Sequence, residues 1–150
     1  MIRILTKEKR MIGFTAGSFD LLHAGHVLML KEAKSVCDHL VVGLHVDPNM
    51  ERERKSKPVQ SLVERQIQLE AVKYVDEVVV YNTEQDLLDM LEAFSIDIRI
   101  IGEEYDDMTY TGKHKTQFVH YNSRKHRYST SLLRHQVFMA HRTQGDDNVT

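Results

Sequence analysis

The sequence predicts an α/β fold: a doubly wound parallel sheet with helices on both faces, in three layers. Two observations carry this prediction. Short runs rich in β-branched residues alternate about four times with segments of helical period. Several of these runs are apolar at consecutive positions, as expected of parallel strands that are buried on both faces. In chain order the expected strands are 12–17, 40–46, 77–81, 96–102 and 117–121.

The segments between the strands have the apolar spacing of amphipathic helices. The first, 27–37, is apolar at three positions and charged on its other side. The apolar stripes expected on the first three helices are Leu30, Ala33 and Cys37; then Val63, Ile67, Ala71 and Tyr74; then Leu87, Leu91 and Phe94. A last helix is expected to begin near Leu132, with a hydroxyl residue of the preceding segment as its N-cap.

Length and composition fit one soluble domain. The chain has 150 residues, a net charge of −2 and a single cysteine, Cys37. We expect a domain over 1–142, with 1–10 as an N-terminal extension and 143–150 as a disordered tail. The balanced charge gives no reason to expect nucleic acid as a partner. Without an internal disulfide, a signal segment or a membrane span, the chain is expected to be cytoplasmic with no membrane partner.

The stretch "GSFDLLHAGH", residues 17–26, follows the first expected strand and opens the next helix. A helix N-terminus offers free N–H groups and a positive dipole end, which together favour a phosphate. Gly25 would let a bulky anion approach the backbone, and His23 and His26 would donate hydrogen bonds to a phosphoryl group. Two other readings stay open here: a pair of metal ligands, which lacks a third donor at a matching spacing, and a purely structural pair.

Three further stretches carry candidate residues near the same edge of the sheet. The irregular stretch 47–61 predicts a long mobile loop. This loop would bring Lys55 and Lys57 toward a polyphosphate. Arg65 stands in the first turns of the next helix, where a cation opposes the helix dipole. "RKHRYSTSLLR", residues 124–134, places a hydroxyl-rich cap behind Arg124, which makes a second phosphate seat.

The acidic pair after the fourth expected strand allows three readings. Glu103 and Glu104 would contact a ribose or base, would be solvated, or would help to hold Mg²⁺ beside a triphosphate.

Together, "GSFDLLHAGH" and "RYSTS" resemble the two signatures of the cytidylyltransferase-like nucleotidyltransferases. The resemblance covers roughly residues 11–138. It implies a Rossmann-like three-layer α/β/α fold with a five-stranded parallel sheet, the HxGH nucleotidyltransferase fold. The length and the stretch 57–81 are most similar to the glycerol-3-phosphate cytidylyltransferase branch.

The resemblance implies roles for individual residues. His23 and His26 would stabilise the transition state, while Lys55, Lys57 and Arg124 would bind phosphates as part of the catalytic set. The implied nucleotide-binding residues are Gly17, Ser18, Phe19, Asp20, Gly25, Arg65, Gly102, Glu103, Ser129, Thr130 and Ser131. Among these, Asp20 would orient the site, Arg65 would reach a phosphate or the nucleotide, and Ser129 with Thr130 would seat the β- and γ-phosphates. No protein metal site is expected; Mg²⁺ would arrive with the nucleoside triphosphate.

The leading hypothesis is transfer of CMP from CTP to a phosphorylated alcohol, most simply sn-glycerol 3-phosphate, giving CDP-glycerol and pyrophosphate. Departures from the family pattern at Arg127, Tyr128 and residues 103–105 put the substrates in doubt more than the reaction. "HAGH" and "KPVQSLVER" also resemble the nucleotidyltransferase half of ADP-heptose synthases, and archaeal FAD synthetases carry similar signatures. ATP with a sugar phosphate or FMN therefore stays open, as does a catalytically inactive nucleotide-binding module. By analogy with relatives of this size, we expect a homodimer.

Overall fold

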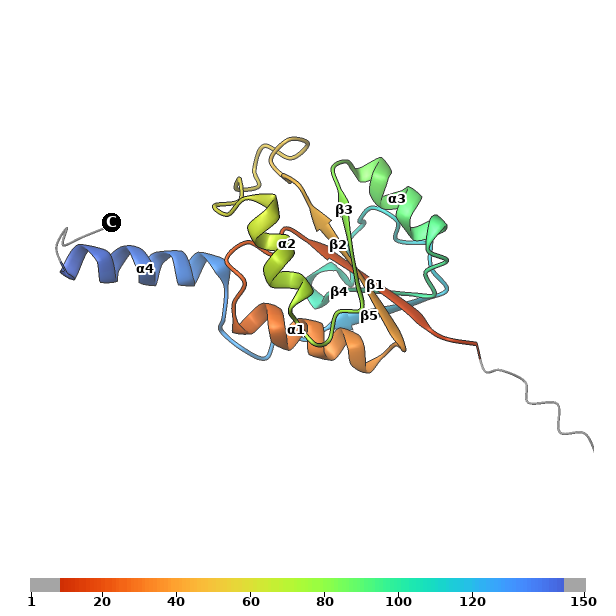
Figure 1. The fold of residues 1–150 in the computed structure, drawn as a ribbon. Helices are drawn as coiled ribbons and strands as arrows, with labels where there is room; N and C mark the ends of the chain where they lie inside the picture. The colour runs from red at the N-terminus through yellow and green to blue at the C-terminus, as the bar shows by residue number, and fades with distance from the viewer. Residues whose placement is uncertain (1–8, 145–150) are drawn as a thin grey trace, which may run out of the picture.

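A computed structural model describes residues 9–144 of the chain as a three-layer α/β/α domain (Figure 1). Five strands form one parallel sheet in the order β3-β2-β1-β4-β5. The strands are β1 (Ile12–Gly17), β2 (His39–His45), β3 (Glu77–Tyr81), β4 (Ile98–Gly102) and β5 (Phe118–Asn122). The helices are α1 (Ala24–Ser35), α2 (Leu62–Glu70), α3 (Glu84–Ala93) and α4 (Thr130–Gln144), with a short 3-10 turn η1 (Glu103–Tyr105) after β4. The predicted fold class and strand number are confirmed.

Two apolar clusters hold the layers together, one on each face of the sheet. On one face Leu30 of α1 and Leu69 of α2 join side chains such as Val42 of β2. On the other face Leu87 and Leu91 of α3 join a second cluster. The stripes predicted on α1 and α3 therefore do face the sheet, because apolar burial is the main favourable term in folding.

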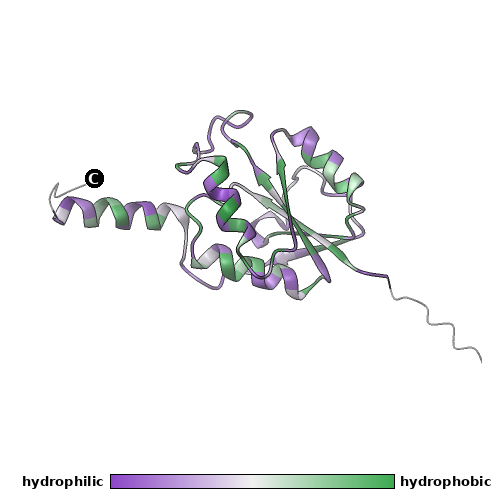
Figure 2. Ribbon diagram, in the orientation of Figure 1, coloured by the Kyte–Doolittle hydropathy of each residue, from purple (hydrophilic) through white to green (hydrophobic). Residues whose placement is uncertain are grey.

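The stripe predicted on α2 is wrong in its phase. Val63 and Ile67 are each 64% exposed, whereas Arg65 and Leu69 are buried. The helix ends at Glu70, so the other two predicted positions lie beyond it. Hydropathy alone misplaced the buried face because a charged residue occupies it. Figure 2 shows the alternation of hydrophobic and hydrophilic residues along this helix.

The last helix leaves the domain rather than packing on it. No residue of α4 is buried, and in Figure 1 the helix projects away from the sheet. The Oγ of Ser129 accepts the backbone N–H of Leu132 at 3.1 Å, which is the expected hydroxyl cap, and the helix begins two residues earlier than predicted. None of the helices in the described part of the chain has the length and apolarity needed to cross a bilayer.

The predicted terminal segments fall partly outside the described residues. The helix α4 continues to Gln144, so the predicted tail is wrong over 143–144, and 145–150 lie outside the described range. Of the predicted extension, 1–8 also lie outside it. The two described residues of the extension contact the domain: Lys9 pairs with Asp97, and Arg10 lies 3.3 Å from the ring of His39.

Candidate active site

A cavity of about 400 Å³ opens at the carboxyl ends of β1 and β4. These neighbouring strands are where the order of the sheet reverses, because the chain runs outward from β1 to β3 and then returns to β4. Ligands of open parallel sheets bind at such switch points. The walls come from the end of β1, the start of α1, the loop after β2, the end of β4 and the segment before α4.

The two histidines of "HAGH" form the cap of α1. His23 is the N-cap residue, and its Nδ1 accepts the backbone N–H of Gly25 at 3.0 Å. The Nδ1 of His26 in turn accepts the backbone N–H of His23 at 3.2 Å. This is a capping box built from imidazoles, and a spacing of three is what such a box requires. The structural alternative for the pair is therefore correct for their Nδ1 atoms.

The caps also fix where each imidazole holds its proton. A nitrogen that accepts a backbone hydrogen bond carries no proton, so in the neutral ring the proton sits on Nε2. Burial, followed by the neighbouring ring of His23, lowers the pKa of His26 to about 4. Burial and then the charge of His126 lower the pKa of His23 as well. At neutral pH both rings are therefore uncharged and keep an Nε2–H donor for other partners.

The first motif contacts the second through one of these Nε2 atoms. The Nε2 of His23 lies 3.1 Å from the Oγ1 of Thr130, the first residue of α4. Gly25 is buried against the rings of His23 and His126: an added Cβ would lie 2.9 Å from Cε1 of His23 and 3.0 Å from Cε1 of His126. The glycine is thus required by the close approach of two imidazoles, in addition to any ligand.

Asp20 and Phe19 are buried next to the site and do not line the cavity. Asp20 is 5% exposed, and its carboxylate accepts the backbone N–H groups of Val59 and Gln60 at 2.8 and 2.9 Å. Arg134 of α4 pairs with the same carboxylate at 3.2 Å. Although burial raises the pKa of Asp20, these hydrogen bonds outweigh it and hold the pKa below its usual value. Asp20 therefore ties the loop after β2 to α4, as an orienting residue would.

Arg65 performs a structural task in this fold, and the expectation that it reaches a phosphate or the nucleotide stays a prediction. Its guanidinium is buried and donates to four backbone carbonyls. The acceptors are the carbonyls of Ser18, His45, Val46 and Gln60, at 2.6 to 3.3 Å. The arginine joins the ends of β1 and β2 to the start of α2, which is why it faces inward on its helix.

The predicted site residues divide into two groups according to whether they line the cavity. Those that line the cavity are Gly17, Ser18, His23, Gly25, His26, Lys55, Gly102, Arg124, Ser129 and Thr130. Those that lie outside its wall are Phe19, Asp20, Lys57, Arg65, Glu103 and Ser131. In the second group, Glu103 accepts the backbone N–H of Arg124 at 3.0 Å, and the carbonyl of Lys57 accepts Arg134 at 3.4 Å. The loop 47–61 does reach the cavity, through Pro48, Arg52 and Lys55.

Several wall residues escaped the sequence reasoning. They are His45, Arg52, Tyr81, Glu84, Arg99, Tyr110, Asn122 and His126. His45, Tyr81 and Asn122 end β2, β3 and β5, so their position at the carboxyl ends of expected parallel strands was an available signal. Arg99 carried a different signal, a single charge inside an otherwise apolar strand.

Within residues 9–144, no group of three or more His, Cys, Asp and Glu side chains lies close enough together to hold a metal ion. The Nδ1 atoms of His23 and His26 are already engaged in the helix cap. The carboxylate on the cavity wall beside the second motif is that of Glu104, 3.6 Å from the guanidinium of Arg124.

A parallel sheet carries a histidine-capped helix and a second, hydroxyl-capped helix at its switch point, and this arrangement agrees with the class of nucleotidyltransferase-like domains. The model of the cytidylyltransferase-like family matches residues 14–141, and the chain belongs to this family. The bifunctional protein HldE of Caulobacter sp. (strain K31) is 41% identical over 102 residues, 67% of this chain and 21% of that protein. HldE of Campylobacter jejuni (strain RM1221) is 32% identical over 89% of this chain and 29% of its own length. The chain thus spans between a fifth and a third of these relatives.

Solved structures share the fold. A lipopolysaccharide core biosynthesis protein from Thermoplasma volcanium GSS1 superposes with a TM-score of 0.64 at 24% identity, covering 78% of this chain and all of that one. A bifunctional NMN adenylyltransferase/ADP ribose pyrophosphatase from Francisella tularensis, complexed with AMP and a manganese ion, gives a TM-score of 0.57 at 16% identity, covering 87% of this chain and 42% of that one.

Proposed function

We propose that the chain transfers a nucleotidyl group from a nucleoside triphosphate to a phosphorylated acceptor, releasing pyrophosphate. A phosphate oxygen of the acceptor forms a bond to the α-phosphorus while the bond from that phosphorus to the bridging oxygen of the β-phosphate breaks. The leaving pyrophosphate takes the electron pair, so no covalent enzyme intermediate is needed. The observation that carries this proposal is the pair of neutral imidazoles beside a helix N-terminus, whose caps leave the ring proton on Nε2. The Nε2 of His23 lies 3.1 Å from the Oγ1 of Thr130, and in this proposal a phosphate oxygen takes the place of that hydroxyl.

The proposed roles follow from what each side chain offers. The Nε2–H groups of His23 and His26 donate to the oxygens of the α-phosphate as negative charge grows on them. Lys55 and Arg124, which line the same cavity, neutralise the phosphates. The N-terminus of α4, with Ser129 and Thr130, receives the pyrophosphate portion. Catalysis of this kind needs positioning and charge stabilisation more than proton transfer.

For the donor and acceptor, the HldE relatives favour ATP with a sugar phosphate. This pair also agrees with the resemblance of "HAGH" and "KPVQSLVER" to the nucleotidyltransferase half of ADP-heptose synthases. CTP with sn-glycerol 3-phosphate, which would give CDP-glycerol, is the second candidate; the description of the matched family and the likeness to the glycerol-3-phosphate branch favour it. FMN as acceptor is a third possibility that the same assay tests.

Mg²⁺ enters this proposal with the triphosphate. Mg²⁺ is usually held by one or two carboxylates together with substrate phosphates and water, and Glu104 offers one carboxylate on the cavity wall. When bound, the ion would supply charge neutralisation for the phosphates. The expected homodimer also stays a prediction; it is supported by exposed apolar side chains on α4, among them Val137 and Phe138, which are 60% and 56% exposed. Light scattering of the purified chain measures the mass that checks it.

The test is pyrophosphate release with Mg²⁺, crossing ATP and CTP against a hexose 1-phosphate, glycerol 3-phosphate, phosphocholine and FMN. Turnover with ATP and the sugar phosphate supports the first pair, and turnover with CTP and glycerol 3-phosphate alone supports the second. No release in any combination, with nucleotide binding intact by calorimetry, favours an inactive nucleotide-binding module.

A further inference from the structure

The cavity has a second wall that the nucleotidyl-transfer roles leave unused. On the α3 side of the sheet it is lined by Tyr81 at the end of β3, Glu84 at the start of α3, Arg99 of β4 and Tyr110. None of these side chains belongs to either signature segment. The ring of Tyr81 stacks on His45 with their centroids 4.5 Å apart, so this wall is closely packed around its polar groups.

Arg99 is the most unusual side chain of this wall. It is only 5% exposed, and its guanidinium lies 5.6 Å from the ring centres of both Phe14 and Tyr110. Its Nη1 donates to the carbonyl of Thr111 at 3.1 Å, but its Nε is buried without any hydrogen-bond partner. Among the described residues no carboxylate forms an ion pair with it. Burial lowers the pKa of Arg99, and Tyr110, Tyr81 and Glu84 offset this only in part.

Glu84 has the complementary deficiency. Its Oε1 accepts the guanidinium of Arg52 at 2.9 Å, while its Oε2 is buried without a hydrogen-bond partner among the described residues. Glu84 and Arg99 line the same cavity, and among the described residues no ion pair joins them. One cavity wall thus holds an unpaired donor and an unpaired acceptor.

Such a pair is costly unless something completes it. A buried polar group without a partner loses its hydration and gains nothing in return, and the loss is larger for a charged group. The faces of two aromatic rings compensate the guanidinium only in part. A hydroxyl group is both donor and acceptor, so the hydroxyl groups of a ligand in this cavity can donate to the Glu84 carboxylate and accept from the Arg99 guanidinium.

We propose that Arg99 and Glu84 form a hydroxyl-recognition subsite for the acceptor, and that they select a polyhydroxylated phosphate ester such as a sugar or polyol phosphate. This inference rests on the proposed function, which supplies the acceptor substrate. It deepens that function by naming the chemical groups at the end of the acceptor that does not react. Arg99 lies in the strand three residues before Gly102, below the carboxyl end where the α-phosphate would bind. The subsite therefore contacts the part of the acceptor farthest from the attacking phosphate.

Binding of matched esters to the full chain tests the subsite without relying on turnover. Calorimetry compares glucose 1-phosphate with cyclohexyl phosphate, and glycerol 3-phosphate with propyl phosphate; each pair differs chiefly in its hydroxyl groups. The wild type should bind the hydroxylated ester of at least one pair about tenfold more tightly or better, since hydrogen bonds to charged groups are the strong ones. Arg99→Met and Glu84→Gln should each reduce that preference to less than about threefold while the affinity for the alkyl phosphate stays unchanged.

Arg52→Gln is the matched control for Glu84→Gln, because it removes the same ion pair but leaves the carboxylate. It should lower affinity for both esters of a pair alike and keep the preference between them. Circular dichroism checks that Arg99→Met folds, and Glu84→Gln, on the first turn of a helix, provides the test if it does not.

The subsite is overturned if the wild type shows no preference for the hydroxylated ester, if it binds neither ester, or if both variants keep the preference. These results are separate from the fate of the proposed function. Turnover without a hydroxyl preference removes the subsite and leaves nucleotidyl transfer standing. A hydroxyl preference without binding of ATP or CTP removes the proposed nucleotidyl transfer and leaves the hydroxyl subsite standing.

Discussion

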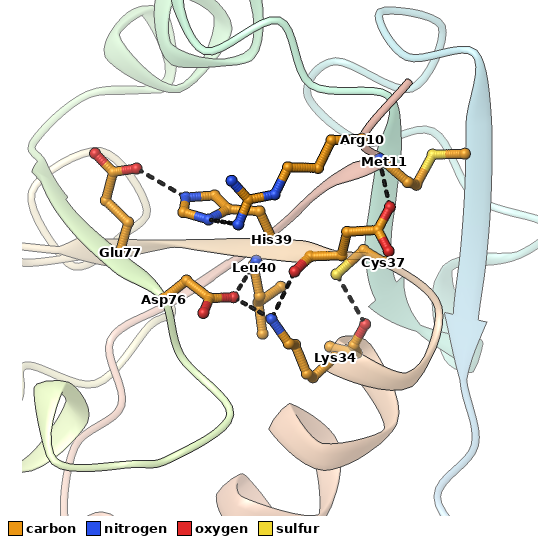
Figure 3. A network of polar contacts seen from close by, with 10 residues as sticks. Arg10, Met11, Lys34, Cys37, His39, Leu40, Asp76 and Glu77 are labelled. Atoms are coloured by element: carbon orange, nitrogen blue, oxygen red, sulfur yellow. Dashed lines mark hydrogen bonds and ion pairs between the residues drawn. The ribbon is translucent and has the colours of Figure 1, made fainter. Parts of the chain in front are cut away.

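The two edges of the sheet treat their polar side chains in opposite ways. At the amino edge, where β1, β2 and β3 begin, the polar groups complete one another (Figure 3). Lys34 donates to the carboxylate of Asp76 and to the carbonyl of Asp38, and Asp76 also accepts the backbone N–H of Leu40 at 2.8 Å. The ring of His39 lies between Arg10 and Glu77 in the same network.

At the carboxyl edge, by contrast, polar atoms remain buried and unpaired. The Nε of Arg99, the Oε2 of Glu84 and the Oδ1 of Asn122 all belong to residues of the cavity wall. Native proteins satisfy most buried polar groups, and their exceptions gather where a ligand is to be bound. The comparison teaches that the polar groups of the amino-edge network complete one another, whereas the cavity wall at the carboxyl edge leaves three buried polar atoms unpaired.

The largest expected effect comes from the proposed catalytic pair at the carboxyl edge, His23 and His26. His26→Ala removes an Nε2–H donor, so we expect kcat to fall by roughly two to three orders of magnitude with the affinity for nucleotide changed little. The same change removes one cap hydrogen bond, at a cost of about 1 kcal/mol in the free energy of unfolding. Steady-state kinetics and nucleotide titration measure the two quantities.

The matched control lies at the other edge: His39→Ala, which should leave kcat unchanged because that ring is engaged only in the amino-edge network. Small and equal losses of rate and affinity in His26→Ala would instead favour a nucleotide-binding module.

The second expected effect is a loss of unfolding free energy in acid, caused by His26 at the carboxyl edge. Because the pKa of His26 in the folded chain is about 4 and the unfolded value is near 6.5, the unfolded chain binds more protons between these values. The stabilising contribution is therefore complete above pH 6.5 and is lost as the pH falls toward 4, on the order of 3 kcal/mol in all. Protonation of Nδ1 would also break the cap hydrogen bond from the N–H of His23.

Urea unfolding at steps from pH 7 to pH 4 checks this dependence. His26→Gln keeps an acceptor at the same cap position and cannot titrate, so its unfolding free energy should fall less steeply over that range. Parallel curves for the two proteins would show that His26 is not the group responsible.

A smaller effect is expected at the amino edge. Burial raises the pKa of Asp76, but the hydrogen bonds from Lys34 and Leu40 outweigh it and lower the pKa below its usual value. Asp76→Ala removes the carboxylate that accepts both hydrogen bonds and should cost about 1 to 2 kcal/mol of unfolding free energy, while kcat and KM stay at the wild-type values. Denaturant melts and kinetics measure these quantities, and Asp76→Asn, which keeps an acceptor for the Leu40 N–H, should lose less. A changed KM would contradict the separation of the two edges.

The strands were predictable because each is a short apolar run, and all five lie within a residue or two of their predicted bounds. The buried face of α2 was not predictable in this way, since the side chain that fixes it is the charged Arg65. Arg65 is buried because four backbone carbonyls receive its donors, and those carbonyls meet only in the folded chain.

The candidate site divides in the same way. His23 and His26 could be recognised from their spacing at a strand-to-helix junction, a local pattern along the chain. Glu84 and Arg99 come from different elements, fifteen residues apart, and face one cavity only through the order of the strands. The buried but unpaired state of their polar atoms has no counterpart in a linear sequence.

The imidazole capping box has a consequence for how this domain would decay under mutation. A serine at position 23 and a glutamate at position 26 would cap the helix at least as well, since these are the usual residues of such a box. The cap hydrogen bonds alone therefore do not require two histidines there. A copy of the domain with serine at position 23 and glutamate at position 26 should keep the start of this helix while losing the proposed nucleotidyl transfer.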